Sequence, residues 1–340
     1  LIFAHGWQPY ISNELPDFDF EGNETIAAWI DDGWNVGIFV WNQFADETTG
    51  VTPTGSWFAD GPPQGVLDAE AKIWTPNGPQ EMRWRDWSEP LWEDGYKPGP
   101  DKSAGQLFYE TYVAALDGYT GTIRLAGHSL GNQMAVRLTQ LVDEGIGAGE
   151  VAEDLRPARV ALLDPYWSPE IRDDLSDGPV AGKKTGDVVR EYITALKTAG
   201  TRFEWYWSSE WTTPNQGDAN DALKPLVLYA EMDPQYASGG LEHHMAPRHL
   251  YFWAYEFPQD PACSGLDDEC RLLGPMSDAQ VSAFDGTHWQ QIAGQTTATP
   301  GDDLYTATQT ISQLPTVAFD AATYTVGEAE GSAPITVTLQ

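Results

Sequence analysis

The residues best suited to chemistry lie in the pentapeptide Gly127-His128-Ser129-Leu130-Gly131, a G-x-S-x-G sequence. An apolar, strand-like run precedes it and an amphipathic, helix-like run (NQMAVRLTQLV) follows it. A tight strand-to-helix turn exposes a serine as a nucleophile for acyl transfer, and the flanking glycines leave room for the neighbouring strand and helix. We therefore predict that Ser129 is a nucleophile. The alternative is a structural turn, and His128 is best explained as support beside it.

Acyl transfer also needs N–H donors for the negative oxygen that forms when the serine attacks. We expect one from the backbone of Leu130, directly after the nucleophile. The opening LIFAHGW is typical of a strand that ends in a tight loop, where Gly6 would allow close approach to a substrate. We assign the second donor to the backbone N–H of Trp7. The alternative is a plain turn, with His5 as a structural residue.

Two aspartates are candidates for the acid that would orient a catalytic imidazole. Asp164 ends the apolar run VALLD before a proline, which places a carboxylate at the carboxyl edge of a parallel strand. Asp233, in LVLYAEMDP, also follows a strand-like run. Either could instead form an Asp-Pro turn. We favour Asp164 and keep Asp233 as the alternative.

The base must be one of six histidines, His5, His128, His243, His244, His249 and His288. The first two belong to the oxyanion loop and the serine turn. His288, in FDGTHWQ, is a late histidine in a predicted loop and is an alternative base. His243 and His244 are the remaining, least favoured candidates for the base. They stand beside Glu242, and we expect them in a solvated loop, because no further ligand pattern nearby indicates a metal site.

Over about residues 1–290, the chain resembles the pancreatic-lipase-like branch of the α/β-hydrolases. The resemblance is carried by four motifs in this order: a strand followed by HGW, then GHSLG, LLDP and RHLYFWAYEF. The resemblance implies Ser129 as nucleophile, Asp164 as acid and His249 as base, in the chain order Ser, Asp, His. It implies no cofactor and no metal. The disulfide framework of animal lipases is absent, and the stretch from Ser129 to Asp164 is longer than in the family.

Strand-like and helix-like runs alternate along the chain, which predicts an α/β fold with a mostly parallel sheet and helices on both faces. Strands are expected at 1–4, 35–44, 122–127, 159–164, 202–207 and 225–230, and helices at 23–34, 103–116, 130–142, 188–199 and 246–257. We assign residues 1–300 to an α/β-hydrolase domain. Its apolar opening is typical of mid-strand, so we expect the sequence to be cropped at its start.

Residues 45–102 lack clear periodicity and are rich in Pro, Gly and Trp, so we interpret them as a lid-like insertion. Its tryptophans, Trp57, Trp74, Trp84, Trp87 and Trp92, could line an acyl pocket or anchor the insertion as a small core. Tyr166 and Trp167, directly after Asp164, are predicted to line the substrate pocket.

The end of the chain changes character. Residues 301–314 are predicted to be a linker, and 315–340 show β-branched alternation that resembles the start of a Calx-β domain, here truncated, which would bind Ca²⁺. Cys263 and Cys270, the only cysteines, are expected to form a short-range disulfide, which implies an oxidising compartment.

The chain has 340 residues and a net charge of −33, which disfavours nucleic acids and anionic membrane surfaces as partners. No apolar run is long enough to cross a membrane. We therefore expect a secreted or cell-surface carboxylic ester hydrolase, of lipase or esterase type, with an ester or lipid substrate. The alternatives are a phospholipase, thioesterase or polyester hydrolase, or a catalytically silent adhesion protein with a Ca²⁺-binding β module.

Overall fold

The structure is a computed structural model that describes residues 1–9, 19–20, 23–51, 61–85, 95–209, 217–257, 269–272, 275–310, 317–319 and 337–339. Its centre is an eight-stranded sheet in the order β12-β11-β10-β9-β8-β7-β1-β4. All neighbouring strands are parallel except the edge pair β11 and β12. The strands are β1 (Ile2–Ala4), β4 (Gly37–Phe39), β7 (Arg124–Ser129), β8 (Arg159–Pro165), β9 (Arg202–Trp207), β10 (Leu228–Glu231), β11 (Thr287–Ala293) and β12 (Leu304–Thr310).

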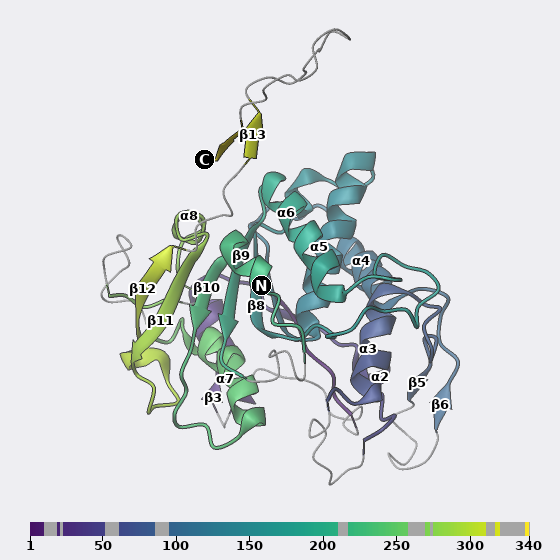
Figure 1. Ribbon diagram of the computed structural model, residues 1–340, viewed down its shortest axis with the longest axis horizontal. Coiled ribbons are helices and arrows are strands. Elements are labelled where there is room, and N and C mark those ends of the chain that lie inside the picture. Colours follow the sequence, from purple (N-terminus) through teal and green to yellow (C-terminus); the bar gives the residue numbers. More distant parts are fainter. Residues whose placement is uncertain are drawn as a thin grey trace, which may run out of the picture.

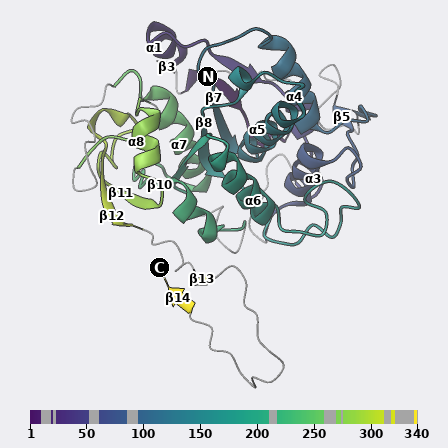
Figure 2. The same cartoon turned by 90° about the horizontal axis from the view of Figure 1, so that it is seen from above.

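Helices cover both faces of this sheet (Figure 1 and Figure 2). One face packs against α3 (Gln64–Trp74), α4 (Ala104–Ala115), α5 (Gly131–Ala148) and α6 (Thr185–Thr198). The other packs against α1 (Ile26–Asp31), α7 (Gly240–Trp253) and α8 (Asp278–Ala283). The short α2 (Asn42–Ala45) follows β4. The predicted mostly parallel α/β architecture is confirmed.

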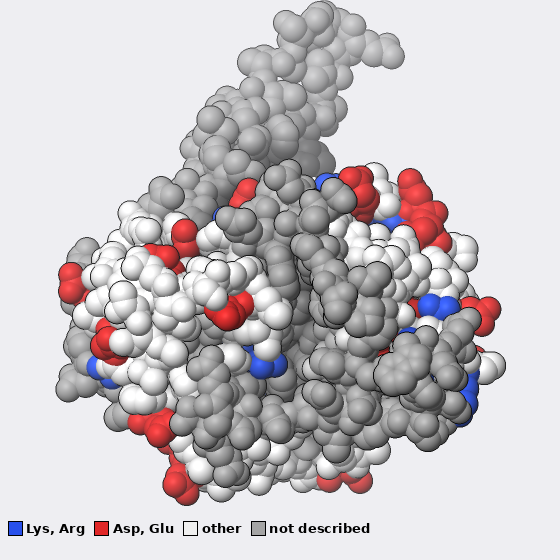
Figure 3. All heavy atoms as spheres, turned by 90° about the horizontal axis from the view of Figure 1, so that it is seen from below, with Lys and Arg blue, Asp and Glu red and all other residues white. Residues whose placement is uncertain are grey.

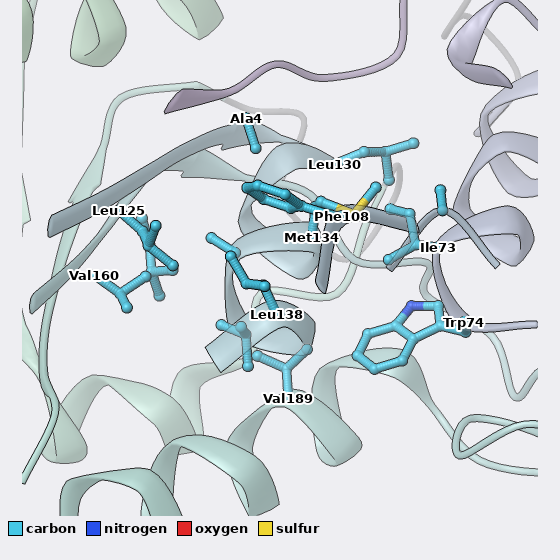
Figure 4. Close-up of a cluster of buried hydrophobic side chains, with 14 of the residues drawn as sticks. Ala4, Ile73, Trp74, Phe108, Leu125, Leu130, Met134, Leu138, Val160 and Val189 are labelled. Atoms are coloured by element: carbon cyan, nitrogen blue, oxygen red, sulfur yellow. The ribbon is translucent and has the colours of Figure 1, made fainter. Parts of the chain in front are cut away.

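Two apolar cores form because successive side chains of a strand point to opposite faces of a sheet. In β8, Val160 and Leu162 belong to the core under α3–α6, whereas Ala161 and Leu163 belong to the core under α7 and α8. Strand β8 is buried along its whole length, which explains the apolar run from Val160 to Leu163 at its centre. Figure 4 shows Leu125 and Val160 of the sheet and Phe108, Met134, Leu138 and Val189 of the helices in the first core.

The insertion predicted at 45–102 contains a regular element. Helix α3 is buried along nearly its whole length, and its Trp74 is 2% exposed and donates a hydrogen bond from Nε1 to Gln133 Oε1 (2.7 Å). The carboxylate of Glu70 in α3 accepts from the N–H of Ser168 (3.0 Å) and pairs with Arg172. This part of the insertion therefore belongs to the core. Trp57, Trp87 and Trp92 lie outside the described residues.

The sheet extends into the segment predicted to be a linker. Residues 301–314 include β12, which pairs antiparallel with β11 from Leu304 to Thr310. The structure therefore places residues 304–310 in the sheet rather than in a linker. Their alternating sequence, LYTATQT, suits an edge strand. Beyond it, β13 (Val317–Phe319) and β14 (Val337–Leu339) form a separate antiparallel pair. Two other short pairs join β2 (Asp19–Phe20) to β3 (Asn23–Glu24) and β5 (Trp84–Arg85) to β6 (Tyr96–Lys97).

Two further expectations concern the cysteines and the membrane. Cys270 is fully buried and disulfide-bonded, whereas Cys263 lies outside the described residues. Within the described part of the chain, no helix combines the length and the apolar character that a membrane crossing requires.

Candidate active site

Ser129 lies at the sharp turn between β7 and α5. Its φ is +55°, in the left-handed region, which costs a residue other than glycine about 1–2 kcal/mol. The turn is tight on both sides: a Cβ added to Gly127 would lie 2.4 Å from the carbonyl oxygen of Gly131, and one added to Gly131 would lie 2.0 Å from that of Ala4. The side chain of Ser129 is partly exposed, and Leu130 follows it as the N-cap of α5.

Asp164 occupies the equivalent edge of the next strand, β8. The pairing of β7 with β8 passes from His128–Leu163 directly to Ser129–Pro165, so Asp164 is the extra residue of a β-bulge. Its φ is +40°. Asn132 ties the two strand ends together, because its Nδ2 donates to the carbonyl oxygens of Ser129 (3.0 Å) and Leu163 (3.1 Å).

The Asp164 carboxylate is completely buried and accepts hydrogen bonds from three residues. Oδ1 accepts from the backbone N–H groups of Ser208 (2.9 Å) and Ser209 (3.1 Å), and Oδ2 accepts from the Ser209 hydroxyl. Oδ2 also lies 2.5 Å from Nδ1 of His244, whose ring is likewise buried. An ionised carboxylate is an acceptor only, so Nδ1 of His244 carries the hydrogen and Nε2 can accept a proton.

Helix α7 carries His244. Pro247 in this helix leaves one backbone carbonyl free to bind a residue from another part of the fold. Pro247 has no N–H to donate to the carbonyl of His243, four residues earlier. The Ser208 hydroxyl donates to this carbonyl instead (2.5 Å). Because the Ser208 N–H also binds Asp164, one residue ties both the carboxylate and the helix that bears the imidazole.

His128 also supports this helix. Burial lowers the pKa of His128 well below its ordinary value, and nearby positive charge adds to the effect. The neutral ring donates from Nε2 to the carbonyl oxygen of His244 (2.8 Å), and the two ring centroids are 4.4 Å apart. His128 therefore has the supporting role expected from the sequence.

The HGW loop after β1 lies directly against Ser129. A Cβ added to Gly6 would lie 2.6 Å from Cβ and 3.1 Å from Oγ of Ser129, so only glycine fits there without displacement. The Trp7 indole donates to the carbonyl of Glu47 (2.8 Å), which fixes this residue over the site.

His5 holds the start of this loop. Burial lowers the pKa of His5 to about 4, so the ring is neutral near pH 7. Its Nε2 accepts from the backbone N–H of Trp41 (3.2 Å), which leaves the hydrogen on Nδ1 to donate to the Gly6 carbonyl (2.9 Å). The Trp41 indole in turn donates to the His5 carbonyl (2.8 Å). The loop that would supply the second oxyanion donor is thus braced by hydrogen bonds on both sides.

Ser129 and His244 open into one cavity of about 270 Å³. The HGW loop and His128 line it, together with Tyr166, Arg248 and the mainly apolar group Pro9, Val66, Leu241 and Met245. Leu241 is 57% exposed at the start of α7. A cavity with an apolar wall and a few converging polar groups is typical of a small-molecule site.

Several predicted residues lie elsewhere. His249 is not the partner of Asp164: its Nε2 accepts from Nη2 of Arg248 (3.1 Å). His288 is in strand β11 rather than a loop, with Nε2 2.9 Å from Glu231 Oε2. Asp233 is exposed and accepts from the Gln235 amide (2.9 Å). Trp167 packs edge-on against Trp205 in the core, so of the two predicted pocket residues only Tyr166 lines the cavity.

His244 ranks last among the candidate bases in the sequence, because the helix is predicted to begin at Ala246 and the histidine pair is predicted to lie in a loop. Helix α7 instead begins at Gly240, with Gly239 as its N-cap. Two local signals favour this earlier start: glycine is acceptable as an N-cap, and Glu242 is an acidic residue in the first turn. Pro247 argues against a helix that begins this early, because proline is disfavoured in a helix interior.

No family model, curated protein or solved structure matches the chain. The described residues also contain no group of three or more His, Cys, Asp or Glu side chains that could hold a metal ion.

Proposed function

We propose that the protein is a serine carboxylic ester hydrolase with an α/β-hydrolase fold, of lipase or esterase type. Ser129 is the nucleophile, His244 the base and Asp164 the acid, in the chain order Ser, Asp, His that this fold uses. The observation that carries the proposal is the convergence of Ser129, in a left-handed conformation, and His244, bound to a buried carboxylate, on one cavity.

The reaction proceeds in two halves. His244 Nε2 takes the hydroxyl proton as Ser129 Oγ attacks the ester carbonyl carbon, and the bond to the alcohol breaks as His244 returns that proton to the leaving oxygen. Water then attacks the acyl-enzyme with His244 again as base, which releases the acid and restores Ser129. Asp164 fixes the imidazole tautomer and stabilises the imidazolium.

The oxyanion of each tetrahedral intermediate would be held by the N–H groups of Leu130 and Trp7. Two features support this assignment. Leu130 is at the N-terminus of the 18-residue helix α5, whose dipole favours negative charge. The close contact of Gly6 with Ser129 brings the second loop to the reacting atoms.

An extracellular setting is part of the proposal. The disulfide at Cys270 supports it, because such bonds persist in oxidising compartments. The pair β13–β14 is compatible with the start of a Calx-β module, and titration with Ca²⁺ would test whether it binds that ion.

A fluorophosphonate probe tests the nucleophile directly. We expect covalent labelling of Ser129, located by peptide mass spectrometry, together with hydrolysis of p-nitrophenyl butyrate. Both should disappear in Ser129→Ala, while Ser168→Ala, which changes a buried serine outside the cavity, should still be labelled. An unlabelled wild-type protein that hydrolyses no ester would contradict the proposal and favour a catalytically silent binding protein.

A further inference from the structure

Helix α3 has fully buried charged groups beside the candidate active site. Acidic side chains lie at several places on the surface shown in Figure 3, as is usual for charged residues. Glu47 and Glu70 are instead completely buried, and Lys72 is 1% exposed. Glu70 and Lys72 belong to α3, and Glu47 pairs with Lys72. Because a buried charge is costly unless it is paired and hydrogen-bonded, the partners of these groups show what the helix holds in place.

The first chain of contacts runs from α3 to the HGW loop. Lys72 Nζ donates to Glu47 Oε1 (2.5 Å), and Arg83 donates to the same oxygen from Nε (2.9 Å). The backbone carbonyl of Glu47 accepts from the Trp7 indole (2.8 Å). The side chain of Glu47 is thus anchored to α3, while its main chain holds the loop that lies against Ser129.

Gly65 brings the start of α3 close to the same carbonyl. A Cβ added to Gly65 would lie 2.4 Å from the carbonyl oxygen of Glu47. The Gly65 N–H also donates to the carbonyl of Thr49 (2.7 Å). The helix and the Trp7 indole therefore meet at one carbonyl oxygen, so a displacement of α3 would be passed on to the HGW loop.

A second chain of contacts runs from α3 to Tyr166, which also lines the cavity. Gln133 of α5 donates from Nε2 to Glu70 Oε1 (2.6 Å) and to the carbonyl oxygen of Tyr166 (2.7 Å). Its Oε1 accepts from the Trp74 indole (2.7 Å). Two residues of α3, Glu70 and Trp74, therefore fix the amide that holds the backbone of Tyr166.

The helix also reaches the cavity and the core beneath it. Val66 lines the cavity directly. Figure 4 shows Ile73 and Trp74 of α3 in the same core as Leu130, the residue after the nucleophile. Reacting groups keep a productive geometry only when a rigid element supports them, and a helix buried along nearly its whole length provides that support.

We propose that helix α3 positions two walls of the active-site cavity, the HGW loop through Lys72 and Glu47, and Tyr166 through Glu70 and Gln133. The inference rests on the proposed function, which supplies the reaction. These four are positioning residues, because none of them is among the described residues that line the cavity. The competing explanation is that the buried polar groups only stabilise the fold.

Lys72→Met tests the link to the HGW loop. We expect kcat on p-nitrophenyl butyrate, per active site titrated with the fluorophosphonate, to fall about tenfold or more, with KM changed less than about threefold. A purely stabilising role would lower the number of titratable sites and leave kcat per site unchanged. Lys197→Met is the matched control, because Lys197 also donates to a backbone carbonyl, that of Leu226, and pairs with Asp285 (2.8 Å).

Trp7→Phe breaks the same link from its other end. It removes the indole donor, keeps the backbone N–H and leaves the buried charges paired, so it does not depend on whether Lys72→Met folds. It should lower kcat per site about tenfold, and Lys72→Met should add less than about twofold to this loss. Independent, multiplied losses in the double variant would overturn the link.

Gln133→Leu tests the link to Tyr166. We expect KM to rise about fivefold or more with kcat per site changed less than about threefold, because the affected wall binds the substrate rather than the oxyanion. The ratio of kcat/KM for p-nitrophenyl acetate and hexanoate should also change. Gln140→Leu is the matched control in the same helix, because Gln140 is buried and bonds Arg137. Equal effects of the two substitutions would contradict the role of Gln133.

Hydrogen–deuterium exchange separates this inference from the proposed function. In Lys72→Met, the amides of residues 4–9 should exchange about tenfold faster or more, and in Gln133→Leu those of residues 163–168 should do so, each without the other. This outcome supports the positioning of the two walls whether or not Ser129 proves to be a nucleophile. If ester hydrolysis requires Ser129 but neither segment exchanges faster, or all segments do so equally, the positioning inference alone fails.

Discussion

Nδ1 of His244 lies 2.5 Å from Oδ2 of Asp164, although 80 residues separate them in the chain. The carboxylate is on the bulge that ends β8, and the imidazole is in the second turn of α7. Because Ser208 binds both the carboxylate and the carbonyl of His243, the two elements are held as one unit. This relationship selects one histidine from six as the candidate base.

The choice of base is the most direct prediction. His244→Ala should lower kcat on a neutral p-nitrophenyl ester by at least about 10⁴-fold, because no other group would take the Ser129 proton. His249→Ala should lower it by less than about tenfold, and His288→Ala, whose ring is beside Glu231, should not change it. Steady-state kinetics would measure kcat for the three variants, and circular dichroism would show whether each variant is folded. A larger loss in His249→Ala than in His244→Ala would return the role of base to His249.

The contact between Gly6 and Ser129 can be tested with a single methyl group. Gly6→Ala would place Cβ 2.6 Å from Cβ of Ser129, so the HGW loop or the serine must move. We expect kcat to fall about 100-fold, as when one oxyanion donor is lost, with slower fluorophosphonate labelling. Gly37→Ala in β4 is the matched control, because nothing lies within 4 Å of its added Cβ. Equal effects of the two substitutions would show that the loop has no special relation to the serine.

The link between Ser208 and Pro247 is suited to a double-mutant cycle. Ser208→Ala leaves the His243 carbonyl without its hydroxyl donor and should lower the free energy of unfolding by about 1 kcal/mol. Pro247→Ala supplies a backbone N–H for the same carbonyl, so Ser208→Ala should then cost less. We expect a coupling energy of about 1 kcal/mol from urea unfolding. Strictly additive effects would mean that the two residues act on the helix independently.

The buried histidines should make the protein sensitive to acid. Burial lowers the pKa of His5 from 6.5 to about 4, so between these values the unfolded chain binds a proton that the folded protein does not. The stabilising contribution is present in full above pH 6.5 and is lost as the pH falls toward 4. His5→Asn should reduce the slope of unfolding free energy against pH by about 1.4 kcal/mol per pH unit in this window. Urea titrations across it measure the slope, and an unchanged slope would contradict a buried neutral His5.

The sequence by itself determined the features that depend on short stretches of backbone. The apolar run, glycines and helical pattern around Ser129 are contiguous, and so is the strand that ends at Asp164. The alternation of strand-like and helix-like runs likewise predicted a mostly parallel sheet with helices on both faces, although it missed β11 and also β12, whose threonines and glutamine resemble a linker.

Only the tertiary structure decided which histidine meets the carboxylate. That choice depends on where α7 begins and how it is rotated against β8, and a shift of a few residues along a helix points a side chain in a different direction. Gly239 begins the helix and Pro247 frees the His243 carbonyl. The position of the helix, however, depends on residues distant in sequence, among them Ser208 and His128. Local patterns encode turns and strand ends, whereas the meeting of two such elements is decided by packing across the whole fold.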